Sequence, residues 1–371
     1  MDLLSYLDTP VRRAYQSGDE DLYSSITLLN KDILNDIDFH EVDIAFLGFP
    51  FSEENQRDSS FADTVRSELA NLAQINGGLS ILDLGNIKKG NSVKDSLVAL
   101  RDVLNFLKGY NVFIITISNC THVKKAFLES TITTSNPNLV EIDPRFAIKK
   151  TLEYLEDDYQ KNINYTNIGY QSYYIFQREL AWLKDNHYSA YRLGEVRADL
   201  SEIEPAIRNS SAINVSLNAL KCQEAPGQSE VAPNGFYSEE ICQLAKYAGA
   251  ADYLGIANIS GFKENSGLQT IRLTAQIIWF FLFGYTLRVT EDPTQDPHIK
   301  KFNVGQKVRG DNLIFYKSDK TDRWWVEVPI NEDKENVILP ANYKDYIDAC
   351  NQQIPDRWLK AMQKYNFKSR L

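Results

Sequence analysis

The sequence predicts an α/β protein of three layers, with helices on both faces of a central parallel sheet. Two observations support this prediction. Between residues 40 and 285, short runs that are apolar throughout alternate with segments whose apolar residues recur at helical spacing. Runs that are apolar on both sides are typical of parallel strands covered by helices. Because the alternation continues without a linker, we expect one domain over residues 41–286.

The elements of this domain follow one another in a regular order. The first strand, within 42–51, is an apolar run that ends at Gly48 and Pro50. Further strands are expected at 79–85, 111–118, 139–142, 167–171, 191–196, 212–217 and 252–259. Helices are expected at 63–74, 92–110, 121–130, 177–186, 238–250 and 268–285. The last helix contains the longest apolar run, 277–285, which has about half of the ~20 residues needed to span a bilayer. We therefore interpret it as a buried helix.

The two ends of the chain have a different pattern of residues. Residues 1–40 are expected to form an N-terminal helical segment. Residues 287–371 are expected to form a C-terminal extension that packs on or beside the main domain. Within it, 312–330 is typical of two antiparallel strands joined by a Ser-Asp-Lys turn. Two helices should follow, with Asn342 and Asp356 as N-caps.

The extension carries three of the five tryptophans, Trp324, Trp325 and Trp358. One interpretation is that these side chains cover the edge of the main core. The other is that they form a partner-binding surface together with Arg323, because Trp and Arg dominate protein interfaces. The sequence leaves both interpretations open.

Composition excludes several classes of function. The 371 residues carry a net charge of −10, which disfavours binding to nucleic acid. The acidic N-terminus differs from a signal peptide, and the four cysteines form no Cys-x-x-Cys pair. We therefore expect a soluble cytoplasmic protein without membrane insertion, a zinc ribbon or a disulfide framework.

Several segments together resemble the ureohydrolase family of arginase, agmatinase and, above all, formimidoylglutamase. They are "AFLGFPF", "LDLGNI", "IGYQSY", "YRLGEV", "EAPGQSEVAPNGFYSEE" and "LQTIRLTAQIIWFFLFGY", in this order over residues 42–285. The resemblance implies the arginase-like fold. It also implies a pair of manganese ions, held by His and Asp side chains at three strand ends, that activate a hydroxide.

The residues at those ligand positions depart from the family pattern. Asp143 matches a family aspartate, and Asn258 stands where the family has a glutamate near the substrate. The other positions hold Asn119 and Arg145 in place of histidines, and Ala147, Asn218 and Leu220 in place of aspartates. His122, Glu224 and Glu230 are nearby in sequence but do not restore the ligand set.

A pair of manganese ions needs several carboxylates to hold it. One aspartate and neutral amides are a poor substitute, and an arginine near a dication is repelled. We therefore expect no metal cofactor and no catalytic residues. We also expect Arg145 to form an internal ion pair with Asp143 in place of the metals.

Three functions remain open on these grounds. The first is a catalytically inactive scaffold or partner-binding subunit that joins a protein partner or a larger assembly, with homo-oligomers left open. The second is a hydrolase of linear amidines of the formimidoylglutamase or arginase type. The third is a metal-free sensor of guanidino or formimino compounds that uses Asp143 and Asn258.

Overall fold

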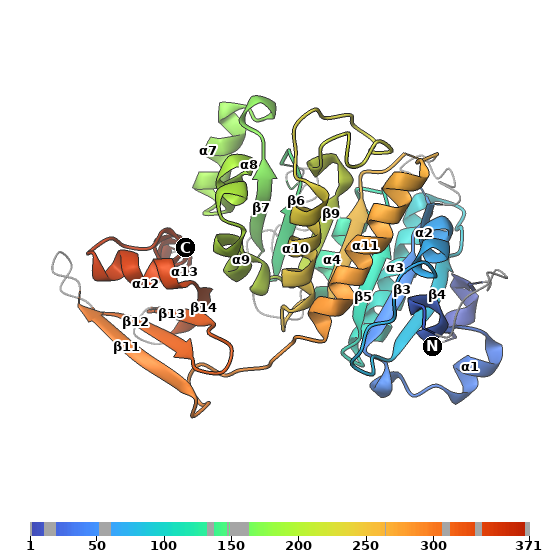
Figure 1. Ribbon diagram of the computed structural model, residues 1–371, viewed down its shortest axis with the longest axis horizontal. Coiled ribbons are helices and arrows are strands. Elements are labelled where there is room, and N and C mark those ends of the chain that lie inside the picture. The colour runs from blue at the N-terminus through green and yellow to red at the C-terminus, as the bar shows by residue number, and fades with distance from the viewer. Residues whose placement is uncertain are drawn as a thin grey trace.

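The computed structural model describes residues 2–10, 20–51, 61–131, 137–146, 148, 163–263, 265–305, 312–330 and 336–367. Within these residues a ten-stranded sheet forms the centre of the molecule (Figure 1). Its strand order is β1-β4-β3-β5-β10-β9-β6-β7-β8, and β2 also pairs with β4. All of its pairings are parallel except that of β1 with β4. The predicted parallel sheet is therefore confirmed.

The main strands of this sheet are short and mostly buried, except for the last strand in the sheet order, which is only partly buried. They are β3 (Ile44–Gly48), β4 (Ile81–Ile87), β5 (Phe113–Ile117), β6 (Asn138–Ile142), β7 (Asn164–Tyr170), β8 (Ser189–Arg192), β9 (Ala212–Ser216) and β10 (Ile256–Ser260). Their register places Ile142, Val215 and Ile259 in one hydrophobic core. It places Leu139, Ala212 and Ile256 in the core on the opposite face. Side chains of both faces are buried, which explains why the strands are apolar throughout.

Helices cover both faces of the sheet. One core includes α2 (Phe61–Leu69), α10 (Ser238–Gly249) and α11 (Leu268–Tyr285), and α10 and α11 cross the front of the sheet in Figure 1. The other core includes α3 (Val93–Lys108), α4 (Val123–Thr131) and α7 (Gln177–Asp185). Within the described part of the chain, no helix is long and apolar enough to cross a membrane. The apolar run at 277–285 belongs to α11, whose side chains fill the first core.

Two local predictions need correction. Residues 191–196 were expected to form one strand, but β8 ends at Arg192, where α8 (Leu193–Ala198) and then α9 (Glu204–Arg208) follow. Residues 1–40 were expected to be helical. They contain α1 (Lys31–Asp36), but also β1 (Leu7–Asp8) and β2 (Ile26–Leu28), which pair with β4. These short strands cover an edge that would otherwise expose backbone groups.

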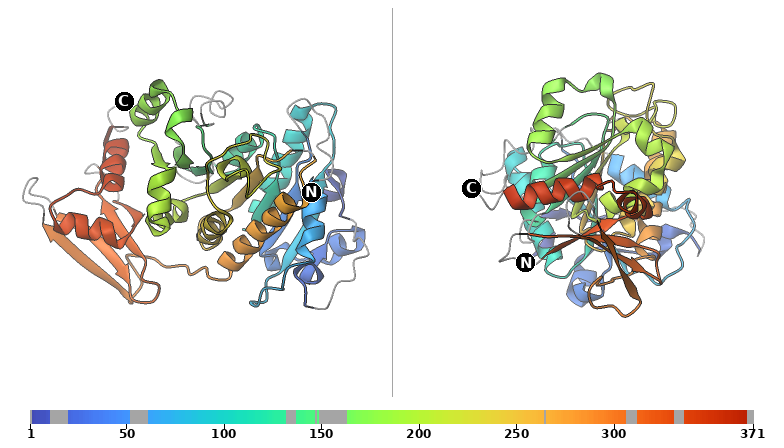
Figure 2. Two further views of the ribbon diagram at one scale, coloured as in Figure 1. Left: turned by 45° about the horizontal axis from the view of Figure 1, so that its top comes forward. Right: turned by 90° about the vertical axis from the view of Figure 1, so that its left-hand side faces the viewer.

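The C-terminal extension forms a second sheet with its own core (Figure 2). Its order is β11 (Ile299–Gly305), β12 (Asn312–Ser318), β13 (Trp324–Val328) and β14 (Val337–Ala341), all antiparallel. The expected hairpin is β12–β13. The helices are α12 (Tyr343–Cys350) and α13 (Asp356–Phe367). Asn342 caps α12 as predicted, whereas Asp356 is the first residue of α13.

Candidate functional site

The positions that the family resemblance assigns to metal ligands gather at the carboxyl edge of the central sheet. Asn119 follows β5, Asp143 follows β6, and Asn218 follows β9; with β10, these strands are neighbours in the order β5-β10-β9-β6. Ligands and reactions are usually found at this edge in parallel sheets. The predicted convergence of the three strand ends is therefore present. Ala147 lies outside the described residues.

The two asparagines at this edge bind backbone groups of neighbouring loops. Asn119 Oδ1 accepts hydrogen bonds from the backbone N–H groups of Gly261 (2.8 Å) and Phe262 (3.1 Å). Its Nδ2 donates to the carbonyl oxygen of Phe262 at 2.5 Å. Asn218 Oδ1 accepts from the N–H of Glu230 at 2.9 Å, and its Nδ2 donates to Ser229 Oγ at 3.0 Å. Both amides therefore fasten loops together.

The remaining two positions lie inside the protein rather than at an open edge. Leu220 is fully buried in the first core. Asn258 is buried within the sheet, where Thr116 Oγ1 donates to its Oδ1 at 2.8 Å. Its Nδ2 donates to Asn214 Oδ1 at 2.8 Å. Asn258 therefore joins β5, β10 and β9 through side-chain hydrogen bonds.

The expected internal ion pair between Asp143 and Arg145 is wrong. The guanidinium of Arg145 lies 3.3 Å from Glu230 Oε2, measured from Nε, and 4.2 Å from the ring centre of Tyr174. Only the backbone N–H of Arg145 bonds to the carboxylate of Asp143, at 2.9 Å. The chain turns after β6, so the long side chain extends over the surface, where it is about half exposed. The carboxylate of Glu230 is available to it there.

A different cation faces Asp143 from the adjacent helix. Lys124 of α4 forms a buried ion pair with Glu141 of β6, and the hydroxyl of Tyr165 donates to the other oxygen of Glu141 at 2.5 Å. Lys124 and Glu141 are 6% and 0% exposed, so the pair is cut off from water. Glu141 lies on β6 and Asp143 directly follows that strand, and the Lys124 ammonium interacts electrostatically with both carboxylates.

The electrostatics of this cluster follow from burial and from its two carboxylates. Burial lowers the pKa of Lys124, but Glu141 and Asp143 outweigh it, so the pKa is raised overall. Burial, with the nearby charge of Glu141, raises the pKa of Asp143 to about 6, although Lys124 opposes this shift. Burial and the hydrogen bond to Glu141 raise the pKa of the Tyr165 hydroxyl. The ammonium of Lys124 thus supplies the positive charge at this centre.

The sequence did contain a signal for this cluster. Glu141 stands in the middle of the apolar run "LVEI", and a carboxylate buried in a strand requires a partner. Two of the other polar residues considered earlier, Glu224 and Glu230, bind groups elsewhere at this edge. Glu224 accepts hydrogen bonds from Ser238 at the start of α10, and Glu230 pairs with Arg145. The described residues contain no group of three or more His, Cys, Asp or Glu side chains that could hold a metal, so His122 is not part of such a group.

The tryptophans of the extension do not form an exposed surface. Trp324 and Trp325 are each 7% exposed and Trp358 is 3% exposed. The indole N–H of Trp358 donates to the carbonyl oxygen of Glu327 at 2.9 Å. The interpretation of these rings as an exposed partner-binding surface is therefore wrong, because they are packed within this chain.

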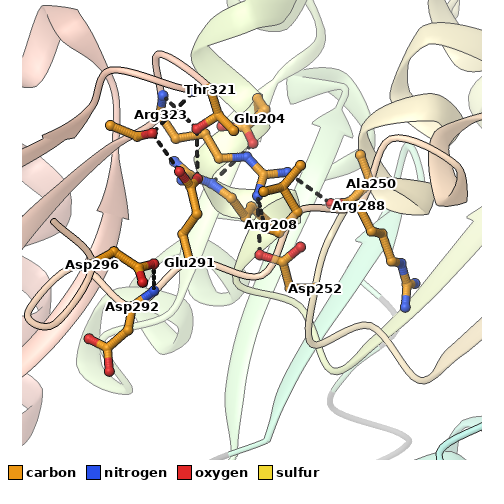
Figure 3. Close-up of polar contacts among 12 residues, drawn as sticks. Glu204, Arg208, Ala250, Asp252, Arg288, Glu291, Asp292, Asp296, Thr321 and Arg323 are labelled. Carbon is orange, nitrogen blue, oxygen red and sulfur yellow. Dashed lines mark hydrogen bonds and ion pairs between the residues drawn. The ribbon is translucent and has the colours of Figure 1, made fainter. Parts of the chain in front are cut away.

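Arg323 joins the extension to the main domain (Figure 3). Its guanidinium pairs with Asp252 at 3.1 Å and donates to the carbonyl oxygens of Ala250 and Val289, both at 3.0 Å. From the main domain, Arg208 donates to the carbonyl oxygen of Trp324 at 3.0 Å. These contacts make Arg323 an internal connection rather than an exposed binding residue.

Comparison with solved structures gives the fold a family context. The chain is similar to the formiminoglutamase of Trypanosoma cruzi with Mn2+, at 15% identity and a TM-score of 0.62, covering 73% of this chain and 100% of that one. It is similar to formimidoylglutamase from Bacillus subtilis, at 16% identity and a TM-score of 0.61, covering 75% and 96%. For the agmatine ureohydrolase of Thermoplasma volcanium the identity is 16%, the TM-score 0.54 and the coverage 68% and 92%.

These similarities confirm the arginase-like fold that the sequence segments implied. No protein-family model matches the sequence, and no curated protein matches it. At such low identity the likeness concerns the fold, and the chemistry of the site has to be argued from its own residues.

Proposed function

We propose that this chain is a catalytically inactive protein with the ureohydrolase fold that acts as a scaffold or partner-binding subunit. The observation that carries the proposal is the ion pair of Lys124 with Glu141 beside Asp143. A resident ammonium at this centre takes the electrostatic role that metal ions have in the related enzymes.

The donor set at the carboxyl edge fits a pair of manganese ions poorly. A two-metal site needs several carboxylates to balance the repulsion between the ions. Here Asp143 is accompanied by amides that already bind backbone groups, and Leu220 is hydrocarbon. A dication about 4 Å from the Lys124 ammonium would meet a repulsion of roughly 8 kcal/mol at an effective dielectric of 20. No hydrolytic step is therefore assigned to these residues.

The partner-binding part of the proposal is supported by the extension. The solved relatives cover about three quarters of this chain, and the four-stranded sheet from 299 to 341 has a core of its own. A folded addition on an inactive domain is a suitable place for an assembly function. A homo-oligomer would satisfy this proposal equally well.

Metal content and turnover test the proposal together. The purified full chain is incubated with excess Mn2+, dialysed, and analysed for manganese and for hydrolysis of formiminoglutamate, arginine and agmatine. We expect neither stoichiometric metal nor turnover. About two manganese ions per chain, the content of a two-metal site, together with release of product would overturn the proposal in favour of a working hydrolase.

A further inference from the structure

Two loops at the carboxyl edge of the main domain present large side chains to solvent. Tyr173 and Phe176 follow β7 and are 62% and 65% exposed, and Val231 precedes α10 and is 64% exposed. The loops are fastened to each other: Gln171 Nε2 donates to the carbonyl oxygen of Asn234 at 3.1 Å, and Asn234 Nδ2 donates to the hydroxyl of Tyr173 at 3.3 Å. The ring of Tyr173 is therefore held in a defined position.

Tyr173 also lines an open hollow of about 740 Å³, which we call the basic hollow. None of the described residues that line it is acidic, although the whole chain carries a charge of −10. Its lining includes three cations and several neutral hydrogen-bonding groups, among them Gln171, Tyr173, Arg192, Arg197, Lys221 and Asn234. The hollow therefore reverses the average charge of the protein.

The three cations are unequally neutralised. Arg197 pairs with Glu240 at 2.9 Å, whereas the pair of Arg192 with Glu195 is long, at 3.6 Å, and exposed. An exposed pair of this kind contributes little. The Lys221 ammonium lies 3.7 Å from the ring centre of Tyr237 and forms no ion pair with a carboxylate within the described part of the chain. Consistently, a hydrogen bond with Lys221 lowers the pKa of the Tyr237 hydroxyl.

We propose that the basic hollow and its exposed rings bind an extended acidic segment of a protein partner. Carboxylates of the segment would meet Lys221 and Arg192, and its apolar side chains would pack on Tyr173 and Phe176. Sites for small molecules are usually enclosed, whereas Tyr and Arg on an open, fixed surface are typical of protein interfaces. The charge contrast selects an acidic partner.

This inference adds a partner-binding location on the main domain, separate from the extension, and it rests on the partner-binding role proposed above. It uses neither the Lys124 cluster nor the positions that the family resemblance assigns to metal ligands. Metal content and turnover can therefore agree with an inactive protein even if this surface binds nothing. Conversely, peptide binding to the basic hollow would not show whether the chain is catalytically active. The measurement of metal content and turnover tests that separately.

Fluorescence anisotropy on the full chain at 0.15 M salt tests the proposal. The probes are fluorescein-labelled peptides Glu-Glu-Phe-Glu-Glu and Gln-Gln-Phe-Gln-Gln, and we expect only the acidic peptide to bind measurably. The double variant Lys221→Glu/Arg192→Glu should weaken binding by about tenfold or more, because like charges then face each other. The control Lys89→Glu/Lys94→Glu changes the net charge equally at a distant edge and should alter the affinity by no more than about twofold.

Two further measurements separate a peptide site from a site for small anions. Tyr173→Ala/Phe176→Ala should weaken the acidic peptide several-fold, and glutarate should displace it only at far higher concentration than the unlabelled peptide does. The milder variant Lys221→Gln is measured if the double reversal lowers the melting temperature. Equal binding of the two peptides, equal effects of the two charge reversals, or displacement by glutarate as effective as by peptide would overturn the proposal.

Discussion

At the scale of single residues, the centre of the molecule is organised by a lysine that faces two carboxylates. Lys124 and Glu141 form a pair with almost no access to water, and Tyr165 completes the hydrogen bonding of Glu141. A buried ion pair adds little to stability compared with hydrophobic side chains in place of both partners. The loss of only one partner, however, leaves an uncompensated buried charge. The cluster is thus sensitive to single substitutions.

Lys124→Met should lower the free energy of unfolding by about 3–5 kcal/mol, because it leaves Glu141 buried without its cation. Urea denaturation followed by circular dichroism measures this difference. Lys125→Met is the matched control: the neighbouring lysine makes only a partly exposed pair with Glu129 at 3.5 Å, so a change within about 0.5 kcal/mol is expected. Equal losses in the two variants would contradict the role assigned to Lys124.

Asp143 should make stability depend on pH below neutrality. Its pKa is raised from 3.8 to about 6 in the folded protein, so between these values the folded state binds more protons than the unfolded state. Stability from this group is therefore fully present below pH 3.8 and is lost as the pH rises through about 6. Asp143→Asn removes the group. In urea denaturation between pH 4 and 7, this variant should gain stability relative to the original chain as the pH rises, and a constant difference would exclude the effect.

At the scale of elements, the carboxyl edge is held together by side-chain amides. Asn119 binds the loop after β10, and Asn218 binds the loop that contains Ser229 and Glu230. Gly261 in the first of these loops has φ of +81°, and a Cβ there would lie 2.8 Å from Ser216 Oγ. The side chains of Asn119 and Asn218 therefore fix the geometry of these two loops.

Asn119→Ala should destabilise the protein by about 1–3 kcal/mol, because the N–H groups of Gly261 and Phe262 lose their acceptor. The comparison is with Asn91→Ala, at an exposed position before α3, which should have little effect. Thermal denaturation of both variants gives the difference. If Asn119→Ala is as stable as Asn91→Ala, the amide does not hold this loop.

At the scale of the whole molecule, the extension is bound to the main domain through arginines. Arg323 binds Asp252 and the carbonyl oxygen of Ala250 in the main domain, together with the carbonyl oxygen of Val289 in the connecting segment. Arg208 donates in return to the carbonyl oxygens of Trp324 and Ala341. Arg208 also lies 4.9 Å from the ring centre of Trp325. Removing one of these arginines should loosen the extension while leaving its own core intact.

Arg323→Ala should lower stability by about 3 kcal/mol, because Asp252 is left partly buried without its partner. It should also speed tryptic cleavage in the segment between α11 and β11. Lys320→Ala, at an exposed position in the same turn, is the control and should leave both measurements unchanged. Unaltered cleavage in the Arg323 variant would show that other contacts hold the extension.

Much of the fold could be predicted because it depends on local patterns. The apolar runs and helical spacing located the strands of the central sheet, and α11 begins and ends at the predicted residues 268 and 285. The strand β11 was missed because it is at most partly buried and lacks a continuous apolar run. The strand β14 is an apolar run of five residues, but it is only partly buried and contains Pro340, which is unfavourable within a strand. The position of α8 was missed because "YRLGEV" begins as a strand and continues as a helix.

The sequence by itself determined which residue types stand at the strand ends, since Asn119, Asp143, Asn218 and Leu220 follow from the order of the segments. Only the tertiary structure decided what these residues contact. Glu230, 85 positions along the chain, takes the guanidinium of Arg145, and the packing of α4 on β6 brings Lys124 to Glu141. The physical reason is that charge partners are chosen by distance in space and by burial, and neither is contained in the spacing of residues along the chain.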